Sequence, residues 1–326
     1  MQSIFTKDNR FYLMGLSAIG VVGLHISLVA RVQHPLQTVI DFLFSHGGAG
    51  VNVFFLLSAY GLCYSYDRNR LPRFYANRVK RIIPMYAIAL MSSFIIKGKD
   101  QLGMISSFIM QLSGLSFFTR CEDTFWFMET LILLYLFFPL IMKTILWFYR
   151  ASRIKMGGVI LYMLLVMACE VPFILSNFNT IIGTICADTA ILLTIPRIPV
   201  IFLGILTYLL EKDNKQNEIY FIYGISAMLS LCGFIKFSYL SIPAIMLLIS
   251  LSNIRPLSRV FCFFGRHSLE IFLGHVLVLP LLKDVKFEYS IYLSAVLALM
   301  AICSLALYYS NKIILSVVEK IIRSCG

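Results

Sequence analysis

Long, nearly uncharged apolar runs are the feature of this chain that most restricts its fold. The first run, residues 11–30, carries a single ionisable side chain, His25. As a helix it spans about 30 Å, the thickness of the hydrocarbon core of a bilayer. Soluble domains contain about 25% charged residues, whereas this chain contains 13% charged and 59% hydrophobic residues. The composition therefore excludes a soluble enzyme and predicts an integral membrane protein.

The apolar runs are continuous rather than alternating, which favours membrane-spanning helices over strands. We expect an all-α, polytopic membrane helical bundle of about ten transmembrane helices, built as one domain over residues 1–326. The run 180–196 contains Asp188 and Pro196, so we interpret it as a re-entrant or interfacial segment. The predicted spans are 11–31, 50–66, 81–97, 125–147, 157–175, 197–211, 219–235, 238–253, 267–283 and 289–311.

Basic residues orient the predicted bundle. With a cytoplasmic N-terminus, twenty of the 28 lysines and arginines fall on the cytoplasmic side, in agreement with the positive-inside rule. An even number of spans then places both termini in the cytoplasm. This asymmetry explains the net charge of +12, so we predict no nucleic-acid partner. The eight cysteines form no CxxC pair, and we expect neither a metal site nor a disulfide framework.

His25 is the first candidate for a functional residue. It lies about 21 Å from the cytoplasmic end of its span, in the outer half of the membrane. An ionisable side chain at such a depth indicates a functional site by default. The alternative is a histidine that only hydrogen-bonds to a neighbouring helix as part of the packing.

The loop before the third predicted span is the second candidate. Arg78 and Arg81 are three residues apart at a helical entry, so they point the same way. Arg73 and Lys80 add charge to the same stretch. Paired guanidinium groups suit phosphate oxygens. The alternative is a basic loop that only sets the topology and binds lipid headgroups.

Two further spans carry ionisable residues. Glu129 lies one turn into the fourth predicted span, beside Trp126, at a depth similar to that of His25. The two could form a carboxylate–imidazole pair, unless Glu129 is simply solvated. His275 lies in the middle of the ninth predicted span, after Gly274, and is either catalytic or structural. Arg197 and Glu170 are weaker candidates. The glycines of the second span, including Gly47, Gly48, Gly50 and Gly61, favour close helix packing near the outer surface.

Together these motifs resemble those of acyltransferase family 3, the bacterial integral-membrane O-acyltransferases that modify surface polysaccharides. The matches follow the order of the family along most of the chain. The histidine of the first helix corresponds to His25, and the glycine-rich entry of the second corresponds to residues 47–61. The other matched positions are Arg78, Arg81, Pro84 and Tyr86; Trp126 and Glu129; Arg197, Pro199, Phe202 and Gly204; and Ser268, Phe272 and His275.

The chain departs from the family pattern at three points. Met14 stands where the family usually has a basic residue, eleven positions before the histidine, and Arg10 is the candidate substitute. Ala59 stands where glycine is expected. The soluble SGNH-type domain that is fused to some relatives is absent from this sequence.

The resemblance implies an enzyme of the bacterial cytoplasmic (inner) membrane. It implies transfer of an acyl group, most often acetyl, from cytoplasmic acyl-CoA to a hydroxyl of a surface glycan or its lipid-linked precursor. No cofactor is expected to be bound; acetyl-CoA serves as co-substrate. Membrane lipids are further partners, and a homo-oligomer remains open. The expected catalytic residues are His25, Glu129 and His275, and the expected substrate-binding residues are Arg10, Arg73, Arg78, Arg81, Tyr86, Trp126 and Arg197.

Two mechanistic questions stay open at this level. His25 is expected to act as general base, but a covalent acyl-histidine is equally consistent with the sequence. The alternative function is a transporter or flippase for a polysaccharide intermediate, which also needs many spans and a few buried charges. A structural scaffold is a third interpretation.

Overall fold

The computed structural model describes residues 5–29, 34–98, 101–119, 125–151, 157–174, 190–231, 255–282 and 288–324. Within these ranges the regular elements are α-helices and two short 3-10 helices, with no strand. The predicted all-α class is therefore confirmed.

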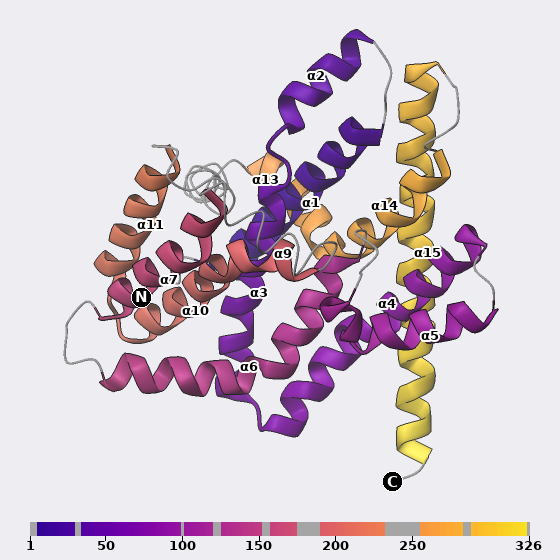
Figure 1. Cartoon of the computed structure of the whole chain (residues 1–326). Coiled ribbons are helices and arrows are strands. Elements are labelled where there is room, and N and C mark those ends of the chain that lie inside the picture. The colour runs from indigo at the N-terminus through magenta and orange to yellow at the C-terminus, as the bar shows by residue number, and fades with distance from the viewer. Residues whose placement is uncertain are drawn as a thin grey trace.

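The described elements follow one another along the chain as a series of helices (Figure 1). Their bounds are α1 (Lys7–Val29), α2 (Pro35–Phe44), α3 (Ala49–Arg68), α4 (Leu71–Lys97), α5 (Gln101–Leu112), η1 (Leu115–Phe118), α6 (Trp126–Ala151), α7 (Gly157–Ile174), α9 (Ala190–Thr194), η2 (Ile195–Arg197), α10 (Ile198–Lys212), α11 (Gln216–Leu231), α13 (Arg255–Arg266), α14 (Ser268–Leu282) and α15 (Tyr289–Ser324).

Several of these helices are long and apolar enough to cross a membrane, which makes the chain a multi-pass membrane protein. In the described residues there are five such stretches: α1, α4, the α2–α3 stretch Pro35–Arg68, most of α6, and most of α15. The pair formed by α13 and α14 makes a sixth if it is counted as one span bent by 69°.

The described residues do not reach the ten spans predicted from the sequence. The predicted spans 157–175, 197–211 and 219–235 correspond to α7, α10 and α11, which are not among the candidate spans. Helices of 15 and 16 residues, as in α10 and α11, are only about 23 Å long and do not cover a hydrocarbon core of about 30 Å. The predicted span 238–253 and most of the predicted re-entrant segment lie outside the described residues.

Two helices differ from the prediction in a way that affects the site. The second predicted span begins at residue 50, but α2 extends it back to Pro35, so that Pro35–Arg68 is one stretch with a turn inside it. The helix α13 (Arg255–Arg266) lies between the predicted spans 238–253 and 267–283, where no helix was predicted. Its sequence places basic and apolar residues at helical spacing, which gives an amphipathic helix that a search for uniform apolar runs does not detect.

Glycines bring α1 into backbone contact with α13 and α3. A Cβ atom on Gly265 of α13 would lie 1.7 Å from the carbonyl oxygen of Phe11, and one on Gly15 would lie 1.9 Å from the carbonyl oxygen of Phe261. A Cβ on Gly47 would lie 2.0 Å from the carbonyl oxygen of Gly20. The glycines between α2 and α3 therefore pack against the middle of α1. The close helix packing predicted for these glycines is therefore seen, at the turn between α2 and α3.

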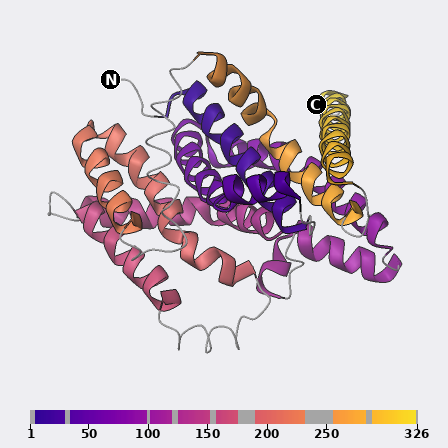
Figure 2. The same ribbon diagram turned by 90° about the horizontal axis from the view of Figure 1, so that it is seen from above.

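The helix α15 stands at the edge of the bundle. Seen from above it stands end-on beside α14 (Figure 2), and in Figure 1 its C-terminal part extends beyond the other helices. Apolar side chains such as Leu305 and Ile313 are 57% and 62% exposed, which suits a helix face that meets lipid. At 36 residues it is about 54 Å long and exceeds the hydrocarbon core of a bilayer.

Candidate functional site

Two histidines from opposite ends of the sequence meet inside the bundle. The Nε2 atom of His275 on α14 lies 3.0 Å from the Nδ1 atom of His25 on α1. The two rings are stacked, with centroids 4.9 Å apart and planes inclined by 21°. His275 is 1% exposed, and its Nδ1 atom has no hydrogen-bond partner among the described residues. One ring donates and the other accepts, so a proton can pass between them.

The local sequence around each histidine explains the contact. Gly274 precedes His275, and a Cβ atom there would lie 2.7 Å from the Oγ of Ser304. The glycine therefore allows α15 to approach α14 closely, next to the buried imidazole of His275. Phe272, one turn earlier, places its ring edge-on to His275 at a centroid distance of 5.1 Å. Packing on these sides fixes the orientation of the His275 ring.

Glu129 does not join this pair, and the predicted Glu129–His25 contact is wrong. In the described part of the chain the hydrogen bond of the His25 side chain goes to His275. Glu129 is 0% exposed, and its Oε1 accepts a hydrogen bond of 2.6 Å from the Ser116 hydroxyl of η1. Similar depth in the membrane was the basis of the prediction, but depth does not specify the direction in which a side chain leaves its helix.

Instead, several predicted residues gather where α6 begins. The guanidinium of Arg197 lies 4.9 Å from the centre of the Trp126 ring and donates to the carbonyl oxygen of Leu193. The ring of Tyr86, on α4, lies 5.6 Å from that of Phe125. We call Tyr86, Trp126, Glu129 and Arg197 the α6-entry cluster.

A short aromatic path connects the α6-entry cluster to the histidine pair. The ring of Phe127 lies 5.1 Å from that of Phe272, which in turn contacts His275. The ring of Trp126 is 6.2 Å from that of Phe127. The histidine pair and the α6-entry cluster are therefore two neighbouring groups instead of one constellation.

A basic cavity of about 370 Å³ forms a second part of the site, where α1, α3, α4 and α6 meet. Five cationic side chains line it, and none of its described lining residues is acidic. Such a surface favours an anionic ligand. The lining residues are Lys7, Arg10, Phe11, Met14, Leu57, Ser58, Gly61, Tyr64, Ser65, Arg68, Asn69, Arg78, Arg81 and Tyr135.

The predicted basic patch divides at this cavity. Arg78 and Arg81 line it, whereas Arg73 and Lys80 are exposed and do not contribute to its lining. The Arg78 guanidinium lies 5.6 Å from the ring of Phe74 and 5.7 Å from that of Tyr135. Its Nε is buried without a hydrogen-bond partner among the described residues. Two aromatic rings therefore hold Arg78 in place while part of its donor capacity remains available to a ligand.

The departure at Met14 and its candidate substitute Arg10 both lie at this cavity. Arg10 lines it together with Lys7, three residues earlier, and Met14, four residues later, so the three lie on the same face of α1. Lys7 and Arg68 were not predicted as site residues. Both lie at helix ends, at the start of α1 and the end of α3, where basic residues are usually explained by the positive-inside rule. For Lys7 the helical spacing of residues 7, 10, 11 and 14 was the signal in the sequence that could have placed it on the same face as Arg10.

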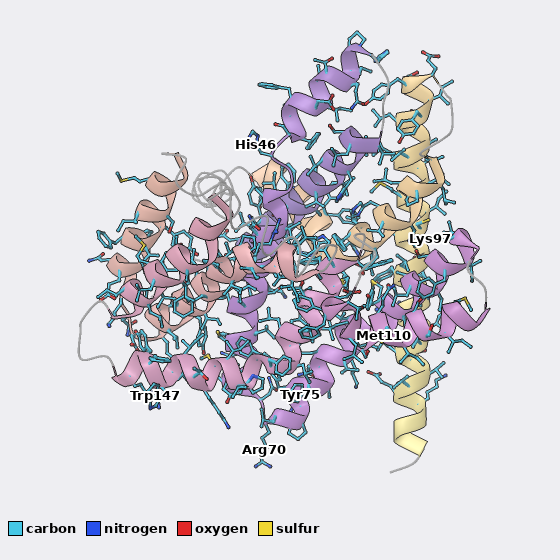
Figure 3. The ribbon with its side chains drawn as sticks, in the orientation of Figure 1. His46, Arg70, Tyr75, Lys97, Met110 and Trp147 are labelled. Atoms are coloured by element: carbon cyan, nitrogen blue, oxygen red, sulfur yellow. The ribbon has the colours of Figure 1, made fainter. Side chains whose placement is uncertain are left out.

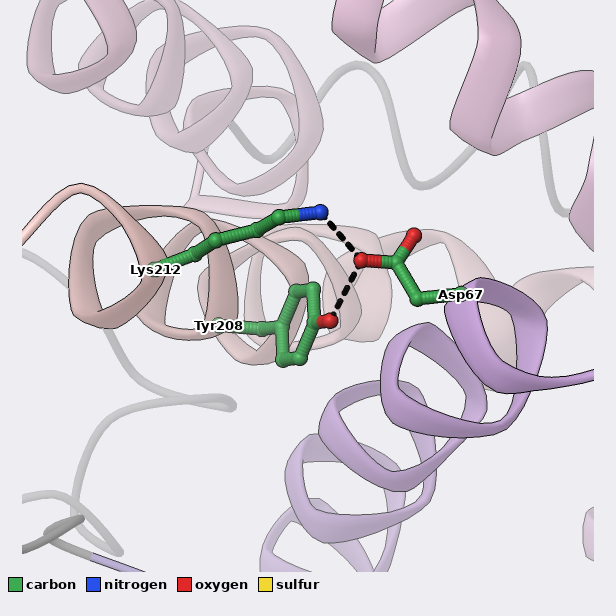
Figure 4. Close-up of polar contacts among 3 residues, drawn as sticks. All are labelled: Asp67, Tyr208 and Lys212. Carbon is green, nitrogen blue, oxygen red and sulfur yellow. Dashed lines mark hydrogen bonds and ion pairs between the residues drawn. The ribbon is translucent and has the colours of Figure 1, made fainter.

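An ion pair with a tyrosine hydrogen bond stiffens the wall of the cavity (Figure 4). Asp67 accepts hydrogen bonds from the Nζ of Lys212 and, at 2.6 Å, from the hydroxyl of Tyr208. Its neighbour Arg68 lies over the ring of Tyr64 at 4.0 Å, and the rings of Tyr64 and Tyr208 are 6.4 Å apart. The carboxylate next to the cavity is thus engaged with α10 and does not neutralise the cations that line it.

The cavity and the histidine pair share one face of α1. Met14 and His25 are eleven residues apart, which corresponds to about 16 Å along the helix axis and a rotation of only about 20°. Between them, Ala18 and Val21 belong to the same apolar cluster as Phe272 and Val276 of α14. A ligand held in the cavity would follow this face to reach His25.

Comparisons with known proteins give one match. Residues 12–309 match the family model described as an acyltransferase domain, in acyltransferase family 3. No curated protein and no solved structure matches the chain. Among the described residues, no three histidine, cysteine, aspartate or glutamate side chains are grouped so that they could hold a metal ion.

Proposed function

Because this chain belongs to acyltransferase family 3, whose domain covers residues 12–309, we propose that it transfers an acyl group from acyl-CoA to a hydroxyl of a glycan. The family establishes an acyltransferase of the membrane. The donor, the acceptor and the roles of individual residues are our proposal, and the single observation that carries it is the joint presence of a basic cavity and a buried histidine pair on one face of α1.

The basic cavity supplies the donor site in this proposal. CoA carries several phosphates at one end and the acyl thioester at the other. Arg78 and Arg81 offer guanidinium forks to the phosphates, and Lys7, Arg10 and Arg68 add positive charge around them. Since CoA is a cytoplasmic metabolite, this end of the bundle faces the cytoplasm, as the positive-inside rule also indicates.

The pantetheine arm then runs along α1 from the cavity toward His25. The distance of about 16 Å between Met14 and His25 suits an extended arm built from two amide units. The path is closed in this structure by the packing of Ala18 and Val21. Donor binding therefore requires α1 and α14 to separate slightly along this face.

At the far end His25 acts as general base. It takes the proton from the acceptor hydroxyl, whose oxygen attacks the thioester carbonyl carbon; the carbon–sulfur bond breaks, and the CoA thiolate leaves and is protonated. His275 is a positioning residue that orients the His25 ring and shares its proton. General-base action of this kind contributes about 10²–10⁴ in rate. A covalent acyl-histidine on His25 remains the alternative route.

We place the acceptor, a surface glycan or its lipid-linked precursor, at the end of the bundle opposite the basic cavity. The protein then works in a bacterial cytoplasmic membrane, with acetyl-CoA as the most common donor. Glu129 and the rest of the α6-entry cluster support the packing between the two ends, since Glu129 is fully buried and bonded to Ser116.

Two measurements test the proposal. Thermal unfolding of the purified full chain, with and without CoA, tests the donor site, and stabilisation by CoA is the expected result. Mass spectrometry of surface glycans from cells with and without the gene tests the reaction, and a loss of one acyl group per acceptor unit is expected. A flippase or scaffold predicts no stabilisation by CoA, and that result would overturn the enzyme mechanism proposed here.

A further inference from the structure

Polar side chains form a second group beyond the histidine pair, at the end of the bundle away from the basic cavity. In Figure 1 this end is marked by α2 and by the first turns of α15, and Figure 3, in the same orientation, shows Arg70 of the α3–α4 turn at the opposite end. We call the group the distal cluster. It consists of Ser27 of α1; His34, Gln37 and Asp41 of α2 and its N-cap; and Tyr289 and Tyr292 of α15.

Apolar side chains lie between the distal cluster and the histidine pair. Tyr289 and Tyr292 belong to an apolar cluster that also contains Val22 and Ile26 of α1, three residues before and one residue after His25. From α14 the same cluster takes Val278, Leu279 and Leu282. These lie three, four and seven residues after His275, so they continue its helix face outward. The distal cluster and the histidine pair therefore border the same apolar cluster of α1 and α14.

Three buried polar atoms of the distal cluster have no hydrogen-bond partner among the described residues. They are the hydroxyls of Tyr289 and Tyr292 and the Oε1 of Gln37. The three side chains are only 1%, 4% and 5% exposed. Buried polar atoms are normally paired, and an exception indicates a ligand, a water or a functional role. Three such atoms in one cluster beside the proposed reaction centre point to a ligand with several hydroxyl groups.

The hydrogen bonds already made in the cluster specify the ligand further. The Nε2 of Gln37 donates to Asp41 at 2.6 Å and to the carbonyl oxygen of Ser27 at 3.2 Å, and the Ser27 hydroxyl also donates to Asp41. This arrangement turns Oε1, an acceptor, away from Asp41. Oε1 and the Asp41 carboxylate both seek donors, and tyrosine hydroxyls can donate or accept. The cluster therefore suits a ligand that donates O–H groups.

Charge and aromatic surface complete the description. Asp41 is exposed and negatively charged, and the six described residues of the cluster include no lysine or arginine, so Asp41 disfavours an anion there. The ring of His34 stacks on that of Tyr289 at 5.1 Å, and the rings of Tyr289 and Tyr292 are 6.4 Å apart. Such rings offer apolar faces to the C–H surface of a sugar ring, with polar tips for its hydroxyls.

We infer that the distal cluster is the acceptor site, and that the unit it binds is a neutral sugar, not a uronate or another anionic unit. The inference rests on the proposed acyl transfer for its role, and it deepens that proposal by naming the substrate class. Tyr289, Tyr292, Gln37 and Asp41 hold hydroxyls that do not react, and the acceptor extends from them toward His25.

Saturation-transfer NMR with the purified full chain in nanodiscs tests the site without requiring turnover. The probes are the p-nitrophenyl glycosides of glucose, N-acetylglucosamine and rhamnose, with p-nitrophenyl glucuronide as the anionic counterpart. We expect at least one neutral glycoside to bind and the glucuronide not to bind. Tyr289→Phe and Asp41→Asn should each weaken the binding about tenfold. The first removes a hydroxyl that can hydrogen-bond to the sugar, and the second removes the negative charge of a hydrogen-bond acceptor.

Tyr309→Phe is the matched control, because Tyr309 lies on α15 but is 57% exposed and belongs to no part of the cluster. It should leave glycoside binding unchanged, and thermal unfolding should show that all variants are folded. Binding of no neutral glycoside, equal binding of the glucuronide, or binding unaffected in Tyr289→Phe and Asp41→Asn would each overturn the acceptor site.

CoA stabilisation of the same preparations separates the two proposals. If CoA stabilises the chain but the glycoside results fail, the acceptor assignment falls and the donor site stands. If the glycosides bind as expected but CoA has no effect, the acceptor site stands and the proposed acyl-CoA reaction falls.

Discussion

At the scale of residues, the histidine pair makes the strongest mechanistic statement. His25 is only partly buried, while His275 is 1% exposed and bonded to it. The partly accessible ring is the one that can meet a substrate, and the buried ring can only act through it. The division of roles between a general base and a positioning residue therefore follows from burial.

His25→Ala should abolish acyl transfer to the acceptor while CoA still stabilises the protein. The expected loss of rate is about 10²–10⁴, measured as initial rates with radiolabelled acetyl-CoA in membranes. His275→Ala should lower kcat without changing KM for acetyl-CoA. His46→Ala is the matched control, since His46 is exposed and bonded only to the adjacent Ser45. Near-normal rates in His25→Ala would contradict the mechanism.

The basic cavity allows an equally sharp comparison between arginines. Arg78→Ala and Arg81→Ala should each weaken CoA binding by about tenfold or more, because each removes a charge-assisted contact to phosphate. Arg73→Ala should have no effect, because Arg73 is exposed outside the cavity. Titration calorimetry at low and high salt measures the affinity for CoA. The difference in affinity between the parent and the Arg78 or Arg81 variant should shrink as the salt concentration rises. Equal losses in all three variants would show that only net charge matters.

The residues show how far sequence reasoning reaches. His25, His275, Arg78 and Arg81 could be selected because their types, depths and spacing are unusual for apolar spans. The contact between His25 and His275 could not be predicted, because it joins positions 250 residues apart and depends on how α14 rotates about its axis. The Glu129 contact has the same origin: the prediction used similar depth along two spans, and the direction in which each side chain leaves its helix was not available from the sequence.

At the scale of elements, the site depends on α1 being held by backbone contacts. The crossing of α1 and α13 brings Gly15 and Gly265 against carbonyl oxygens of the partner helix. This contact fixes α1, which carries both Arg10 at the cavity and His25 at the pair. The helix α13 was missed from the sequence because its polar positions interrupt the apolar pattern, although its glycine is what makes the crossing possible.

Gly265→Ala should therefore destabilise the fold strongly, because its Cβ would lie 1.7 Å from the carbonyl oxygen of Phe11 and the helices must move apart. Overpacking of this kind costs about 1–3 kcal/mol or more. Gly224→Ala on α11 is the control, since a Cβ there meets nothing within 4 Å and alanine favours a helix by about 1 kcal/mol. Thermal unfolding of the two variants should shift in opposite directions. A Gly265→Ala protein as stable as the parent would show that the crossing is adaptable.

At the scale of the whole molecule, the proposal requires the two ends of the bundle to face different compartments. The basic cavity lies near the α3–α4 turn, where Arg70 points away from the bundle (Figure 3), and the distal cluster lies at the other end. The C-terminal end of α15 lies on the same side as this turn (Figure 1). The proposal places that side in the cytoplasm, on the basis of the positive-inside rule and of the location of acyl-CoA.

Fusions to the C-terminus test this arrangement, because α15 ends on the side of the basic cavity. A C-terminal green fluorescent protein should be fluorescent and a C-terminal alkaline phosphatase inactive, since the phosphatase folds only outside the cytoplasm. A phosphatase fused after α2, at residue 45, should be active. An active phosphatase at the C-terminus would place the cavity outside the cytoplasm, where it could not meet CoA. The five cations of the cavity would then need an extracytoplasmic anion as ligand, and the direction of the whole reaction scheme would reverse.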